Sequence, residues 1–131
     1  MTINVTRDSS GKAVGLVIGA ASLSWNRIVG FPGHTSHQLV VDGDPVDWFV
    51  ERAGHPTQLN PWQTFEYFDD GTAQSVVVIN LKGRTVDGKF KTSADAKEAV
   101  EQVYQYRWMK YWTAERQLEL LREFNAAEAQ H

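Results

Sequence analysis

Side chains that could bind a metal or transfer a proton gather in the first half of the sequence. The candidates are His34, His37, His55, Asp42 and Asp47. Imidazole and carboxylate ligands suit zinc or another divalent cation. A histidine oriented by an aspartate also suits general acid–base catalysis. A metal-binding protein or a small enzyme that uses the loop at residues 30–37 is therefore one function to consider.

The spacing of these residues does not favour that function. His34 and His37 form an H-x-x-H motif, but Gly33 before it and the apolar residues 39–41 after it favour loop and strand over helix. Residues three apart on a strand point to opposite faces of the sheet. The sequence also contains no phosphate-binding glycine loop, dinucleotide-binding motif, serine elbow or H-E-x-x-H motif. We therefore expect no catalytic activity and predict no cofactor.

Aromatic residues are concentrated between residues 104 and 112, in the run YQYRWMKYW. On a helix, Trp108 and Trp112 share one side with Tyr104 and Tyr111, while Tyr106 points to roughly the opposite side. Two aromatic sides cannot both pack on one sheet, so an interaction surface is expected here. Its predicted members are Tyr106, Arg107, Trp108, Lys110 and Trp112. The alternative is that all of these rings belong to the core.

Cations at residues 82–91 raise single-stranded nucleic acid as another partner. They are Lys82, Arg84, Lys89 and Lys91, with Asp87 the only acid among them. The cations would contact phosphates while Tyr106 or Trp108 stacks on a base. The alternative is a solvated edge strand that its cations protect from aggregation.

Composition sets further limits on function. The chain has 131 residues, 42% of them hydrophobic, with a formal net charge of −3 and no cysteine. This length suits one domain over residues 1–131, with enough buried surface for a core. The acidic balance argues against a strongly basic nucleic-acid-binding protein. The missing cysteines exclude disulfides, cysteine-ligated zinc and cysteine nucleophiles.

The apolar run at residues 13–23 has only eleven residues, whereas a membrane-spanning helix needs about 20. Its flanking residues also fit a signal peptide. Ile3 and Val5, however, alternate with polar neighbours ahead of the run, which is typical of a strand. We therefore expect a cytoplasmic protein without a membrane partner. Residues 2–7 and 13–23 should form a hairpin whose second strand is central in a sheet.

A short helix is predicted over residues 45–53. Asp44 fits its N-cap, Pro45 its first position and Gly54 its end. Strands are predicted over residues 37–42, 65–68 and 74–81. The last of these should be central because residues 76–79 are all β-branched. Asp70-Gly71 and Asp87-Gly88 fit hairpin turns.

The sequence becomes helical in period from Ser93 onward. Ser93 fits an N-cap with Asp95 in the first turn. Thr113 should divide this region into helices over about 93–111 and 114–128. The predicted fold is therefore α+β, with helices packed on one face of an antiparallel sheet.

These patterns favour a small non-catalytic binding module that acts through the aromatic helix. It would work as a homo-oligomer or bound to a partner protein. The metal or enzyme function and single-stranded nucleic-acid binding remain as alternatives.

Overall fold

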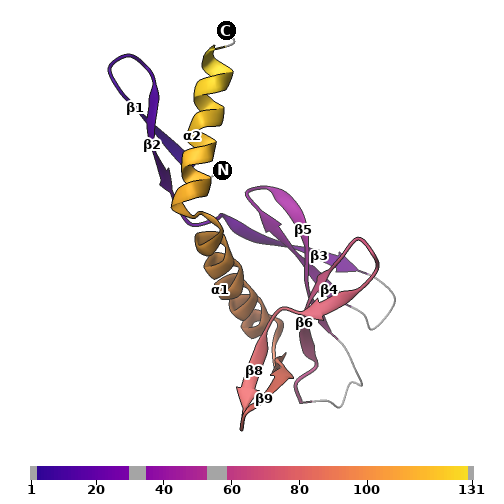
Figure 1. The fold of residues 1–131 in the computed structure, drawn as a ribbon. Coiled ribbons are helices and arrows are strands. Elements are labelled where there is room, and N and C mark those ends of the chain that lie inside the picture. Colours follow the sequence, from indigo (N-terminus) through magenta and orange to yellow (C-terminus); the bar gives the residue numbers. More distant parts are fainter. Residues whose placement is uncertain (1–2, 30–34, 53–58, 130–131) are drawn as a thin grey trace. The chain divides into compact units, whose positions relative to one another are not determined.

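The computed structural model describes residues 3–29, 35–52 and 59–129 (Figure 1). These residues form antiparallel sheets and two C-terminal helices, which confirms the α+β class. The chain divides into two compact units. The central unit is Leu23–Tyr104, and the terminal unit is Met1–Ser22 with Gln105–His131. A single domain over the whole chain stays a prediction.

One antiparallel sheet forms the base of the central unit. Its strands are β3 (Leu23–Val29), β4 (Thr35–Val41), β5 (Asp44–Arg52), β6 (Trp62–Tyr67), β7 (Ala73–Ser75) and β10 (Lys89–Phe90). The strand order is β10-β6-β5-β4-β3, and β7 also pairs with β6. The predicted strand over 37–42 and the hairpin around Asp70-Gly71 are confirmed as β4 and as the β6–β7 pair.

The predicted helix over residues 45–53 is wrong, because residues 44–52 form strand β5 between β4 and β6. The cause is the turn that precedes it. Asp42 and Gly43 have positive φ angles of 50° and 87°, as a two-residue primed turn requires. This turn returns the chain antiparallel to β4, with Val41 paired to Asp44. Ladder hydrogen bonds on both sides then outweigh the helix-capping signals.

The core of the central unit lies between this sheet and residues 93–104 of α1 (Ser93–Tyr111). Leu39 and Val50 from the sheet and Val100 from α1 are fully buried. At the edges of this core, the Trp25 indole donates a 3.0 Å hydrogen bond to Glu101. The Trp48 and Tyr104 rings meet edge to face, with their centroids 5.1 Å apart. Helix α1 therefore covers the sheet face that carries Leu39, Trp48 and Val50.

The predicted single strand over 74–81 is wrong, because β7 ends at Ser75 and residues 78–81 belong to a separate two-stranded ribbon in the central unit. Strands β8 (Val78–Leu81) and β9 (Arg84–Asp87) form a two-stranded sheet whose residues are all exposed. The turn lies at Lys82-Gly83, where both φ angles are positive, and not at Asp87-Gly88. The residues 76–79 therefore do not make a central strand, although they are β-branched.

The terminal unit contains a hairpin, β1 (Ile3–Arg7) and β2 (Ala13–Ile18), and helix α2 (Ala114–Ala129). The predicted hairpin is confirmed, and its turn is held by Asp8, whose carboxylate accepts the N–H groups of Ser10 and Lys12. The prediction that its second strand is central is wrong, because β2 pairs only with β1 among the described residues. Helix α2 packs along β2 (Figure 1).

Two side-chain amides join the helices to the extended chain of the terminal unit. Asn125 accepts the N–H of Ala13 at 3.0 Å and donates to its carbonyl at 3.1 Å. Gln105 makes the same pair of bonds with Ala21, at 3.0 and 2.8 Å. Both alanines are buried, so these amides satisfy backbone groups that water cannot reach.

The helix boundaries are close to those predicted. Thr113 separates α1 from α2, and its hydroxyl accepts the N–H of Arg116 at 3.3 Å as an N-cap. The N-cap of α1 is Thr92 and not Ser93, because the Thr92 hydroxyl accepts the N–H of Asp95. In the described part of the chain, neither helix has the length and apolar character of a membrane span.

Replacing Gln105 by Leu should lower the free energy of unfolding of the terminal unit by about 1–3 kcal/mol, because it leaves two buried backbone groups unpaired. Urea unfolding followed by tryptophan fluorescence measures this loss. The control is Gln102→Leu, since Gln102 is exposed on the same helix and should change stability far less. Equal losses in the two variants would contradict the role of the Gln105 amide.

Candidate functional site

The last two turns of α1 expose large side chains. Tyr106 is 65% exposed, Met109 73% and Tyr111 52%. Tyr106 and Met109 are three positions apart on the helix, so their side chains are neighbours. We call Tyr106, Met109, Lys110 and Tyr111 the aromatic surface, which extends round the helix because Tyr111 lies about 140° from Tyr106. The helical period correctly predicted that Tyr106 and Trp108 point to different sides, but the sequence reasoning omitted Met109.

Two predicted anchors, Trp108 and Trp112, support this surface from within the terminal unit. Both are half-buried. The Trp108 indole donates a 2.9 Å hydrogen bond to the carbonyl of Gly19. The Trp112 ring meets the rings of Trp108 and Tyr111 edge to face, with centroids 5.8 and 5.2 Å apart. These contacts orient Tyr111 and leave it partly in solvent.

Cations lie against the exposed rings. The Lys110 ammonium is 5.7 Å from the centroid of the Tyr106 ring, and the Arg116 guanidinium is 4.0 Å from that of Tyr111. Arg116 also donates a 2.9 Å hydrogen bond to the Tyr111 carbonyl. Arg107 is exposed beside them. The surface therefore combines aromatic faces with positive charge, as cation–π contacts favour.

A small pocket of about 150 Å³ lies next to the aromatic surface on α2. Its lining residues are Tyr111, Trp112, Arg116, Glu119, Leu120 and Glu123. The indole N–H of Trp112 is buried and has no hydrogen-bond partner among the described residues. The pocket thus carries a guanidinium and two carboxylates.

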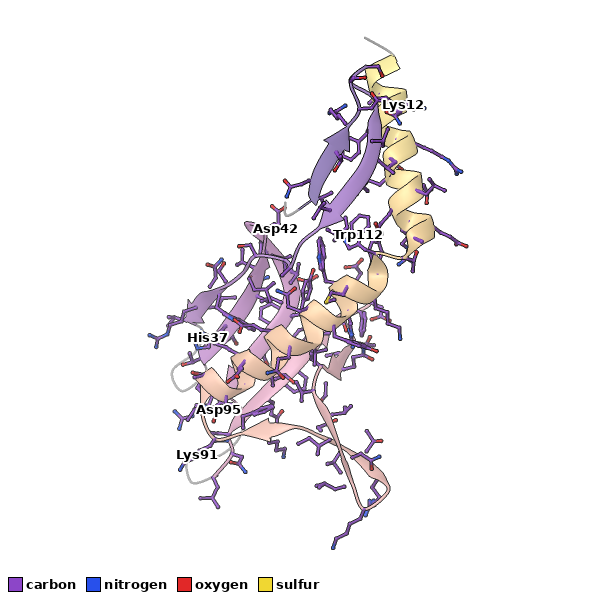
Figure 2. All side chains as sticks on the ribbon, turned by 90° about the vertical axis from the view of Figure 1, so that its left-hand side faces the viewer. Lys12, His37, Asp42, Lys91, Asp95 and Trp112 are labelled. Atoms are coloured by element: carbon purple, nitrogen blue, oxygen red, sulfur yellow. The ribbon has the colours of Figure 1, made fainter. Side chains whose placement is uncertain are left out.

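The predicted metal or acid–base residues are not brought together in the described part of the chain. His34 and His55 lie outside the described residues. His37 is near the start of β4, and Asp42 follows the end of that strand (Figure 2). They are five positions apart along extended chain, which is roughly 16 Å. Asp47 is exposed on β5, and no group of three metal-ligating side chains exists among the described residues.

His37 is half-buried on the face that α1 covers, with its ring centroid 5.8 Å from that of Trp62. Burial lowers the pKa of His37 below its usual value of 6.5, and the positive charges of Lys97 and Arg27 lower it further. A neutral imidazole is therefore favoured at pH 7. These positive neighbours oppose binding of a metal cation.

The predicted nucleic-acid residues are all exposed but lie on different elements. Lys82 and Arg84 lie on the β8–β9 ribbon, whereas Lys89 is on β10 and Lys91 follows it. These four residues belong to the central unit, and Tyr106 and Trp108 belong to the terminal unit. A shared binding surface for them stays a prediction.

The sequence reasoning missed a cluster on the sheet face away from α1. Tyr67 donates its hydroxyl to Glu51, whose two carboxylate oxygens both lie 2.9 Å from it. The Tyr67 ring also contacts the rings of Phe49 and Phe65, with centroids 5.3 and 6.1 Å apart. Burial and the Glu51 carboxylate raise the pKa of Tyr67 to about 12. The pairing of Phe49 with Phe65 depends on the β5–β6 register, which the predicted helix concealed.

Comparison of the chain with protein-family models, curated proteins and solved structures found no match. Its function is therefore argued from its own residues.

The lowered pKa of His37 predicts a loss of stability in mild acid. As the pH falls below about 6.5, the unfolded chain takes up this proton before the folded chain does, so the free energy of unfolding decreases. Urea unfolding at about pH 7.5 and about pH 5 measures the effect. A His37→Asn variant should lose less stability than the parent over this range. The same loss in both proteins would contradict the prediction.

The raised pKa of Tyr67 predicts a loss of stability in alkali. Its contribution is fully present below pH 10 and is lost as the pH rises toward about 12, because the unfolded chain releases the phenolic proton first. Burial also raises the pKa of Tyr104, but the latest transition in the ultraviolet absorbance of tyrosinate should be that of Tyr67, and Tyr67→Phe should remove it. Glu51→Gln should move this transition to lower pH, and an unchanged midpoint would exclude a contribution from the carboxylate.

Proposed function

We propose that this protein is a non-catalytic interaction module that associates with a second copy of itself through the aromatic surface. The observation that carries this proposal is the exposure of the neighbouring side chains Tyr106 and Met109 near the end of α1, with Tyr111 exposed further round the helix. Soluble monomers rarely leave large apolar side chains grouped in this way. Tyrosine and methionine are also enriched in protein interfaces.

The distribution of charge in the terminal unit supports a second copy as the partner. Lys110 lies on the aromatic surface, while Glu119 and Glu123 line the adjoining pocket. None of these three side chains forms an ion pair within the described residues. In a two-fold symmetric dimer, a patch meets its own copy, so a patch that carries both signs can place each charge opposite its counter-charge. The cation of each copy can then face the carboxylates of the other.

The half-buried tryptophans have a supporting role in this proposal. Trp108 and Trp112 pack inside the terminal unit and hold the Tyr111 ring in place. Aromatic side chains have only two rotatable χ angles, so those already held by packing lose little conformational entropy on binding. A rigid aromatic surface of this kind favours association over a flexible one.

Sedimentation velocity over a range of protein concentrations tests the proposal. The parent chain should dimerise, and Met109→Asp or Tyr106→Ala should weaken the dimer by about 1–3 kcal/mol each. Circular dichroism should show that these variants remain folded, because both side chains are exposed. A parent chain that stays monomeric at all concentrations would overturn the proposal and leave a different protein as the partner.

A charge-reversal pair gives a sharper test. Lys110→Glu alone and Glu123→Lys alone should each weaken the dimer through like-charge repulsion, and an equimolar mixture of the two variants should restore association. Lys12→Glu is the matched control, since Lys12 is exposed at the hairpin turn and is far from Trp112 in the same unit (Figure 2). If mixing restores nothing, these two charges do not face each other.

A further inference from the structure

Three basic side chains converge on the helix-covered face of the central sheet. Arg27 on β3 is directly opposite His37 on β4 in the strand register, so their side chains project from the same face as neighbours. Lys97 reaches this area from the second turn of α1, and its ammonium is 5.8 Å from the Trp25 ring centroid. Figure 2 shows His37 beside the first turns of α1. We call Arg27, His37 and Lys97 the basic cluster.

The cluster lacks internal charge compensation. The charges of Lys97 and Arg27 both act on the His37 imidazole, so the three groups are close enough to repel one another. Among the described residues, none of the three forms an ion pair or a side-chain hydrogen bond. The acids on the neighbouring turns of α1 are Asp95, Glu98 and Glu101, and Glu101 already accepts the Trp25 indole N–H.

The chemistry of the cluster fits an oxyanion. Arginine and lysine bind phosphate oxygens through charge-assisted hydrogen bonds, and a histidine ring adds a further N–H donor. Arg27 is exposed, and His37 and Lys97 are half-buried, so all three remain accessible to a ligand. The rings of Trp25 and Trp62 flank the cluster. Such rings offer surfaces on which a base can stack.

We propose that Arg27, His37 and Lys97 form a binding site for the phosphate group of a nucleotide or of a nucleic-acid strand. The site lies in the central unit, so it is independent of the aromatic surface and of the proposed dimer. It also differs from the basic stretch at residues 82–91, because its members come from β3, β4 and α1. The bound phosphate would neutralise a repulsion that the described residues leave in place.

Titration of the protein with inorganic pyrophosphate, followed by NMR of the histidine ring, tests the site. Binding should shift the His37 resonance and raise the pKa of His37, because the bound anion favours imidazolium. A His37→Asn variant assigns the resonance. Absence of any shift at millimolar pyrophosphate would overturn the proposal.

Calorimetry on matched variants separates this site from general attraction to positive charge. Arg27→Gln and Lys97→Gln should each weaken pyrophosphate binding about tenfold or more. Arg84→Gln should leave it unchanged, since Arg84 is exposed on the β8–β9 ribbon. Equal weakening by all three substitutions would overturn the proposal, and circular dichroism verifies that each variant is folded.

The two sources of phosphate are distinguished by a single-stranded thymidine oligonucleotide. If the oligonucleotide binds more tightly than pyrophosphate, and if its affinity falls steeply with salt concentration, the ligand is a nucleic-acid strand. Equal or weaker binding of the oligonucleotide identifies a small phosphate compound. In both cases the affinity should depend on Arg27 and Lys97, and an affinity independent of them contradicts the site.

Discussion

The terminal unit depends on two carboxamides that act as pieces of backbone. A carboxamide presents one donor and one acceptor side by side, so it can pair with the N–H and C=O of one extended residue as a neighbouring strand would. Asn125 does this at Ala13, and Gln105 does it at Ala21. Without these amides, four buried backbone groups would lose their partners, at about 1–3 kcal/mol for each unsatisfied group.

The Gln105 amide also helps to decide which side of α1 faces outward. Gln105 directs its side chain to Ala21, and Trp108, three positions later, donates to Gly19. Together they turn one side of the helix toward the extended segment. Tyr106 follows Gln105, and Met109 follows Trp108, by one 100° step of the helix, and both are largely exposed. The hydrogen bonds of Gln105 and Trp108 thus help to leave Tyr106 and Met109 in solvent.

Local signals predicted the helices well and the strands less well. The break at Thr113 was predictable because a threonine hydroxyl competes for backbone N–H groups and caps helices. Residues 45–53 were misassigned because Asp44-Pro45 resembles a helix start, while the decisive signal, Asp42-Gly43, lies just before it. Periodicity could not settle the matter, since Val46, Trp48 and Val50 also alternate as in a strand. The exposed β8–β9 ribbon shows that β-branched composition does not fix burial.

The candidate sites differ in how well the sequence predicts them, because the residues of one site are close together along the chain and those of the other are far apart. Tyr106 and Lys110 are one helical turn apart, so helical geometry alone brings them together. Arg27, His37 and Lys97 come from two strands and a helix, and only the β3–β4 register and the packing of α1 bring them together. The sequence analysis therefore identified His37 as a candidate site residue but grouped it with aspartates. Its actual neighbours are cations, which reverses the charge of the ligand that this site favours from a metal ion to an anion.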